Sequence, residues 1–340
     1  MLIHIEHSDG LKVSDIEVED TTFSALGLVE SQVEEFLRRN IDVVLEEETL
    51  LIIGQQVINA AKGRSDLVAI DGNGSIVLIE IKRDVADIKC RHEPFEFQAI
   101  RYAASLATIK DVDDLVSRIF AKYIGDHLCE FELGGLTCSE LGKRILTDFL
   151  RQNNADRTFN QNQRIILIAS DFDEQTLSAV AWLIKNDVDI SAFRITPKTF
   201  QEHLFFDASV ILPPESLDSF YVDISAPKKP VAIRPGGEGR RNLPRMKTLM
   251  EWGLVSKGDI LVIVNHNDSD AEVLDHSTVK YKDESLTFNE WGSKVTGWSA
   301  ICIYEWARKK NGTKTLAELR AAKMEEITKS QQNEALDSEL

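Results

Sequence analysis

The segment from Gly63 to Lys82, GRSDLVAIDGNGSIVLIEIK, constrains the fold of this 340-residue chain more than any other. Two apolar runs rich in β-branched residues, Ser65–Asp71 and Ser75–Lys82, flank an Asp-Gly-Asn-Gly turn sequence, and this pattern predicts a β-hairpin. Because side chains alternate faces along a strand, Glu80 and Lys82 share one face of the return strand. The segment therefore places a carboxylate and an ammonium side by side at the end of an apolar strand.

The hairpin also brings a second carboxylate to the same rim, because Asp66 begins the partner strand and Glu80 ends the return strand. Mg²⁺ prefers oxygen ligands and usually takes one or two protein carboxylates, with water and phosphate supplying the rest. Asp66 and Glu80 are therefore candidate ligands of Mg²⁺ or Mn²⁺, and Lys82 is a candidate for stabilising charge on a phosphate or orienting water. The alternative interpretation is a surface ion pair at a strand end.

Two predicted helices add candidates to this site. An upstream amphipathic helix carries Glu34 within its apolar face, with Glu35 as the alternative. A downstream helix over Phe95–Ile109 carries Gln98 and Tyr102 four residues apart, which places them on one face. The apolar spacing of this second helix leaves open that Tyr102 belongs only to the core.

The order of these residues resembles the PD-(D/E)xK nuclease superfamily, and in particular the branch of archaeal-type mismatch and flap endonucleases. Ser65 stands where the superfamily name has proline, and a charged insert, Asp84–Glu93, precedes the second helix. The resemblance implies a restriction-endonuclease-like core, with a central mixed sheet flanked by helices, and Mg²⁺- or Mn²⁺-dependent hydrolysis of phosphodiester bonds in DNA. The catalytic residues that it implies are Glu34, Asp66, Glu80, Lys82, Gln98 and Tyr102.

Further along the chain, a strand–helix–strand unit is predicted over Arg164–Ser170, Gln175–Asn186 and Ile190–Ile195. A crossover of this kind joins parallel strands, so it is expected to extend the central sheet. Trp182, on the helix, is expected in the core. The fold class is therefore mixed α/β, with residues 1–215 forming one domain.

Residues 216–242 form a predicted linker, rich in proline, glycine and basic residues. The linker region is either a spacer or a strap that contacts phosphates. Its basic residues, together with those just after it, are Lys228, Lys229, Arg234, Arg240, Arg241, Arg245 and Lys247. Arg64, in the hairpin segment, is a further candidate for contacting nucleic acid.

Residues 243–320 are predicted to form a small α+β domain, with short strands and a helical stretch over Phe288–Trp306, followed by a polar tail over 321–340. The turn that begins at Gly253 and the Thr296-Gly297-Trp298 sequence resemble a module fused to restriction enzymes and adenine methylases. This resemblance implies DNA binding. The alternative interpretation of the tryptophans is that they form the core.

The net charge of −17 opposes binding to DNA at long range, so binding would depend on local positive charge, metal ions and salt. The four cysteines are scattered, which argues against a zinc site and fits a reducing cytoplasm. No secretory signal or membrane-spanning run is expected. Cutting both strands of a duplex usually takes two active sites, which favours a homodimer without requiring one.

These observations predict a metal-dependent DNA endonuclease of repair or of restriction and defence. The alternative is a DNA-binding or regulatory protein that keeps the nuclease fold without cleaving.

Overall fold

The computed structural model describes residues 3–7, 11–17, 19–59, 63–84, 94–200, 203–213 and 243–338. They divide into two compact units. The first contains the described residues up to Val44 and from Leu51 to the end of β9 (His203–Leu212). The second contains Leu45–Leu50 together with the residues from 243 onward.

The predicted hairpin is present as β5 (Arg64–Asp71) and β6 (Ile76–Lys82), which pair antiparallel from Leu67 opposite Ile79 to Ile70 opposite Ile76. The Asp71 carboxylate stabilises the turn, because its Oδ1 accepts hydrogen bonds from the backbone N–H groups of Asn73 and Ser75, both at 2.9 Å. Gly74 has a φ of +83°, which glycine adopts without steric cost. All seven residues of β6 are buried, Glu80 and Lys82 included.

The central sheet has seven strands in the order β3-β8-β7-β6-β5-β4, with β9 paired to β8. Strands β6, β7 (Gln163–Ala169) and β8 (Ile190–Phe200) run parallel, and β3 (Glu19–Asp20) and β9 pair antiparallel with β8. The sheet ends at β4 (Leu50–Ile58). The predicted parallel extension is confirmed, and the molecule is mixed α/β with a mixed central sheet.

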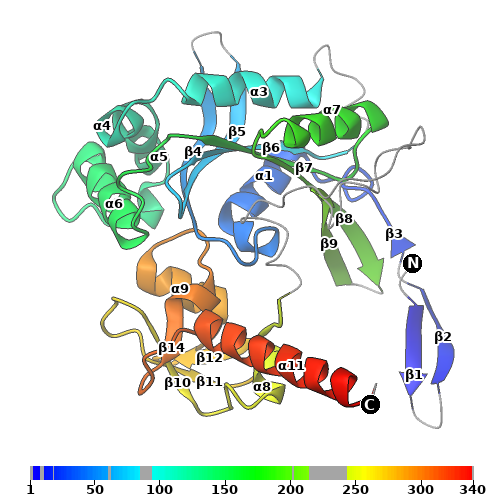
Figure 1. The fold of residues 1–340 in the computed structure, drawn as a ribbon. Coiled ribbons are helices and arrows are strands. Elements are labelled where there is room, and N and C mark those ends of the chain that lie inside the picture. The colour runs from blue at the N-terminus through cyan, green and yellow to red at the C-terminus, as the bar shows by residue number, and fades with distance from the viewer. Residues whose placement is uncertain are drawn as a thin grey trace. The chain divides into compact units, whose positions relative to one another are not determined.

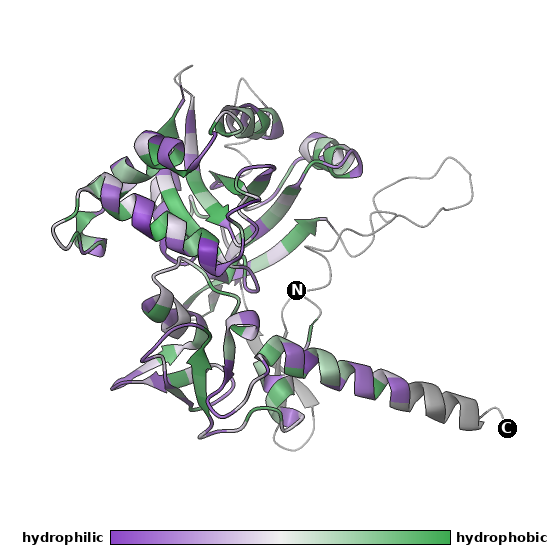
Figure 2. Cartoon of the chain, turned by 60° about the vertical axis from the view of Figure 1, so that its left-hand side comes forward, coloured by the Kyte–Doolittle hydropathy of each residue, from purple (hydrophilic) through white to green (hydrophobic). Residues whose placement is uncertain are grey.

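Helices cover this sheet on both sides. α3 (Phe95–Leu106) and α7 (Glu174–Lys185) lie next to each other over one face, and α1 (Glu30–Arg39) lies on the other side (Figure 1). In Figure 2 the strands of the sheet are largely hydrophobic, whereas hydrophilic and hydrophobic residues alternate along the helices, as expected for helices that bury one face. The remaining elements of this unit are β1 (Ile3–His7), β2 (Leu11–Glu17), η1 (Ile41–Val43), α4 (Val112–Leu115), η2 (Val116–Phe120), α5 (Ala121–Asp126), η3 (Leu128–Glu130) and α6 (Cys138–Gln152).

The second unit has a five-stranded antiparallel sheet in the order β13-β12-β11-β10-β14. The predicted continuous helical stretch over Phe288–Trp306 is wrong, because Gly297 adopts a φ of +75° and ends the helix. The polar tail continues a helix through Ser338. The elements are β10 (Ile260–Ile263), β11 (Ala271–Val273), β12 (Thr278–Tyr281), β13 (Glu284–Thr287), β14 (Ala307–Lys309), α8 (Met246–Glu251), α9 (Phe288–Thr296), α10 (Ile303–Trp306) and α11 (Leu316–Ser338).

Nothing in the sequence indicated that Leu45–Leu50 belongs to the second unit. Glu47 explains this placement, because its carboxylate accepts hydrogen bonds at 3.0 and 3.1 Å from the guanidinium of Arg320. Both side chains are buried, and the Arg320 guanidinium also lies over the Tyr304 ring. None of the helices in the described parts of the chain is long and apolar enough to cross a membrane.

Candidate functional site

Asp66, Glu80 and Lys82 meet at one end of the hairpin. The register of β5 and β6 places Leu67 opposite Ile79, so one step further along the ladder Asp66 faces Glu80. The Asp66 carboxylate is fixed there, because its Oδ2 accepts a hydrogen bond of 2.8 Å from the backbone N–H of Ile81. The exposed fractions of Asp66, Glu80 and Lys82 are 7%, 0% and 1%. The structure therefore brings together the three hairpin residues that the sequence singled out, and it buries them.

The Lys82 ammonium lies among acidic groups from two elements. Its Nζ is 3.6 Å from Oδ2 of Asp66 and 3.4 Å from Oε1 of Glu30, at the start of α1. It also donates to the backbone carbonyl of Ile81 and lies 5.4 Å from the centre of the Phe95 ring. The ion pairs compensate a positive charge that would otherwise be costly to bury.

Helix α1 supplies Glu34, which is 3% exposed between the buried residues Val33 and Leu37. Its Oε2 accepts a hydrogen bond from Nε2 of Gln56. Its Oε1 is buried and makes no hydrogen bond of ordinary geometry with a described residue, although the Gln55 amide approaches the carboxylate. This incompletely satisfied carboxylate is a candidate for holding a ligand.

The pKa of Glu34 is raised to about 7. Burial is the main cause, and the negative charges of Asp66 and Glu30 add to it. The amides of Gln55 and Gln56 oppose the shift, because they donate hydrogen bonds that favour the charged form. Glu34 is therefore a carboxyl group whose proton can be exchanged near neutral pH.

Gln98 and Tyr102 of α3 lie at the start of β5 rather than against the carboxylates. The Tyr102 hydroxyl accepts hydrogen bonds from the backbone N–H of Arg64, at 3.0 Å, and from Nε2 of Gln98, at 3.3 Å. A Cβ atom at Gly63 would lie 2.4 Å from the Tyr102 ring, so this close approach requires glycine. Tyr102 is half-buried and fixes the backbone two residues before Asp66.

Gln56 of β4 is a site residue that the sequence reasoning missed. Its Nε2 donates to Oε2 of Glu34 and, at a long 3.5 Å, to Oδ1 of Asp66. Its Oε1 accepts a hydrogen bond of 3.2 Å from Nη1 of Arg64. A signal was available, because Gly54 and two glutamines interrupt the apolar residues of β4, and an isolated glycine in a strand often marks a bulge or a close backbone approach.

A second polar cluster lies next to the site on the same helix. Arg38 uses all five of its N–H donors: two go to Glu35, two to Glu130 and one to the Tyr123 hydroxyl. The pKa of Glu35 falls to about 2, chiefly because Arg38 donates to its carboxylate, and the pKa of Glu130 is lowered for the same reason. Beyond this cluster, the His127 ring lies 3.0 Å from Oε1 of Gln55.

The residues proposed to contact nucleic acid fall into three groups. Arg64 and Lys247 are exposed, and Arg245 forms an ion pair with Glu46. The other five predicted contacts lie outside the described residues: Lys228, Lys229, Arg234, Arg240 and Arg241. For Trp291 and Trp298, the structure favours the interpretation that they form the core, because they are only 0% and 4% exposed.

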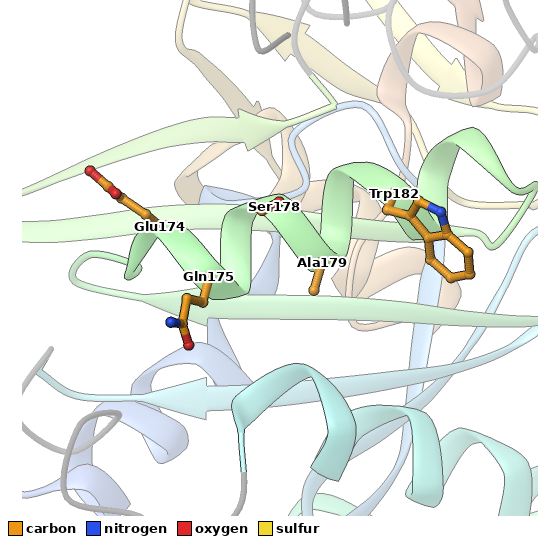
Figure 3. A pocket seen from close by; sticks show the side chains of 5 residues that line it. All are labelled: Glu174, Gln175, Ser178, Ala179 and Trp182. Atoms are coloured by element: carbon orange, nitrogen blue, oxygen red, sulfur yellow. The ribbon is translucent and has the colours of Figure 1, made fainter. Parts of the chain in front are cut away.

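The prediction that Trp182 lies in the core is wrong, because this residue is 61% exposed. The face of α7 that packs inward carries Thr176, Val180 and Ala181, and Trp182 lies on the other side. Figure 3 shows it projecting from α7 with the side chains that line a hollow of about 580 Å³. The lining residues are Glu174, Gln175, Ser178, Ala179 and Trp182.

Within the described ranges, no three His, Cys, Asp or Glu side chains converge closely enough to ligate one ion. A cation at this site would therefore take few protein ligands and complete its coordination with water or substrate oxygens, as Mg²⁺ commonly does. Comparisons with models of protein families, with curated proteins and with solved structures gave no match to this chain.

Proposed function

We propose that this chain is a metal-dependent DNA endonuclease whose first unit has a restriction-endonuclease-like core. The observation that carries the proposal is the meeting of Glu34 and Asp66, two buried carboxylates, beside the Lys82 ammonium. Like charges in a buried site repel one another, and a bound cation is a common reason for such an arrangement. The pKa of Glu34 is raised mainly by burial, and the negative charge of Asp66 adds to the shift.

Asp66 and Glu80 are the residues that would hold Mg²⁺ or Mn²⁺, with Glu34 close enough to Asp66 to assist. The donor set fits a hard cation, because it consists of carboxylate oxygens and includes the incompletely satisfied Oε1 of Glu34. A bound divalent ion polarises a phosphate and lowers the pKa of its water.

The chain's own residues have separate roles in this proposal. The Lys82 ammonium stabilises negative charge that develops on the phosphate, a task for which its ion pair with Asp66 positions it. Glu34, buried beside Asp66, would assist by holding the ion or the water bound to it. Gln98 and Tyr102 fix the strand that carries Asp66.

DNA affinity would come from the basic segment between the units and from the second unit, with the exposed Arg64 beside the carboxylates. In a chain with a net charge of −17, local clusters of this kind must supply the attraction to phosphates. A homodimer would supply the two active sites that cutting a duplex usually takes.

A DNA-binding protein that keeps this fold without cleaving is the second candidate. It is favoured by the lack, in the described parts of the chain, of three converging metal-ligating side chains. The two candidates differ in metal uptake, which makes metal binding the first quantity to measure.

The test is incubation of the purified chain with Mg²⁺ or Mn²⁺ and single-stranded, branched, mismatched or methylated duplex DNA, beside a titration of Mn²⁺ binding. Cleavage of at least one substrate, lost in Asp66→Asn, is the expected result. Firm DNA binding with no Mn²⁺ uptake would favour the second candidate, and intact substrates throughout would overturn the endonuclease proposal.

A further inference from the structure

We infer that Gln56 is a positioning residue that holds the Glu34 and Asp66 carboxylates together in the geometry needed for a divalent cation. This inference rests on the proposed function and goes beyond it, because it assigns a role to a residue outside the acidic and basic set. Three features of Gln56 support this role: its backbone conformation, its hydrogen bonds to carboxylates, and its hydrogen bond with Arg64.

The backbone of Gln56 is in an unusual conformation for a residue inside a strand. Its φ is +51°, in the left-handed region that residues other than glycine, asparagine and aspartate seldom enter. The strand is closely packed two residues earlier, because a Cβ atom added at Gly54 would lie 2.7 Å from Cγ2 of Val57 and 2.6 Å from Cγ2 of Ile119. Such conformations persist where the surroundings fix them, and they concentrate at functional sites.

The side chain of Gln56 connects carboxylates from two different elements. Its Nε2 amide donates to Glu34 on α1 and lies 3.5 Å from Oδ1 of Asp66 on β5. The amide N–H₂ group lies between the two carboxylates, and its partial positive charge offsets part of their mutual repulsion. An amide donor in this place holds the two carboxylates close to each other, as two ligands of one cation must be.

The other end of the amide fixes its orientation. Oε1 of Gln56 accepts from Nη1 of Arg64 at 3.2 Å, so Nε2 must face the carboxylates. Arg64 in turn donates its backbone N–H to the Tyr102 hydroxyl. A hydrogen-bonded chain therefore runs from α3 through β5 and β4 to Glu34. Partners that orient metal ligands typically contribute about 10–100-fold to metal affinity or activity.

The experiment compares Gln56→Gly and Gln56→Met in the full chain by Mn²⁺ titration, thermal unfolding and cleavage kinetics. Glycine adopts a positive φ freely, whereas methionine keeps the bulk and the strain, so the two variants should shift the melting temperature differently. Both lack the amide. Both should weaken Mn²⁺ binding about 10-fold or more and lower kcat, with KM for DNA unchanged.

The control is Asn265→Gly, which changes another residue with a positive φ, +62°, at an exposed position of the second unit, whereas Gln56 is half-buried. It should leave Mn²⁺ affinity and kcat unchanged. If both Gln56 variants bind Mn²⁺ within twofold of the wild type, while the wild type binds Mn²⁺ and cleaves, Gln56 has no positioning role. If the wild type itself neither binds Mn²⁺ nor cleaves, the proposed function fails instead.

Discussion

Glu34 and Glu35 are neighbours on α1, yet their pKa values are about 7 and about 2. Glu35 belongs to a cluster in which every N–H donor of Arg38 is in use, and Arg38 and Arg39 together balance the charges of Glu35 and Glu130. Glu34 lies against Asp66 and Glu30, and its Oε1 is incompletely satisfied. Under the proposed function, the first cluster serves stability alone, whereas the second would gain from a bound cation.

The largest expected effect is that of Lys82→Ala on cleavage. Removing one group that stabilises developing charge typically costs about 10²–10³ in rate. DNA affinity should change little, because Lys82 is 1% exposed and, in the proposed mechanism, acts only at the reacting phosphate. Single-turnover cleavage and DNA binding would be measured for both proteins.

The matched control is Lys122→Ala, which removes an exposed lysine that pairs with Asp126 one turn along its helix. Its cleavage rate should equal that of the wild type. A rate for Lys82→Ala within threefold of the wild type would remove the lysine from the mechanism.

The next effect is the pH dependence of stability at Glu34. Its pKa is higher in the folded protein, about 7, than the ordinary value of 4.5, so the folded state binds the proton more tightly. This contribution to stability is complete below pH 4.5 and is lost as the pH rises through 7. Glu34→Gln should therefore stabilise the metal-free protein at pH 8 by on the order of 2–3 kcal/mol, and by much less at pH 5.

Urea unfolding of Glu34→Gln and wild type at pH 5 and pH 8, in the presence of a chelator, gives this comparison. Adding Mn²⁺ at pH 8 should stabilise the wild type more than the variant. An equal difference in unfolding free energy at both pH values would show that Glu34 does not titrate between them.

Glu35→Gln should do the reverse of Glu34→Gln. The folded pKa of Glu35 is lowered, so its contribution to stability is present above pH 4.5 and is lost as the pH falls toward 2. Because its side chain is 36% exposed, solvent screening limits the loss at pH 7 to about 1 kcal/mol. The free energy of unfolding of Glu35→Gln at pH 7 should be lower than that of the wild type, and its cleavage rate should stay within threefold. A large loss of cleavage would show that the Glu35 cluster also contributes to activity.

The smallest effect is expected at two exposed basic residues of the second unit. Arg245 forms an ion pair with Glu46, which would compete with a phosphate, and Lys247 lies two residues later. If this segment contacts phosphates, Lys247→Ala should reduce the slope of log affinity against log salt by about 0.9, and Arg245→Ala by less. The slopes come from affinities for one duplex measured at several salt concentrations. Slopes equal to that of the wild type would show that neither residue contacts a phosphate.

Much of the hairpin followed from the sequence because its determinants are local. Strand alternation places Glu80 and Lys82 on one face whatever surrounds them, and the turn sequence sets the register that brings Asp66 opposite Glu80. The amphipathic pattern of α1 favoured Glu34 over Glu35 for the same reason, since helical spacing places it between Val33 and Leu37.

Packing between distant segments decided the rest. Gln56 contacts Glu34, which lies 22 positions away in the sequence. The Arg38 cluster includes Glu130, 92 positions away, and Glu47 pairs with Arg320, 273 positions away. The exposure of Trp182 likewise depends on which face of α7 meets its neighbours. Periodicity states which faces a chain presents, but the partner that satisfies a buried charge is set by the tertiary structure, because that charge interacts with whatever the fold brings within a few ångströms.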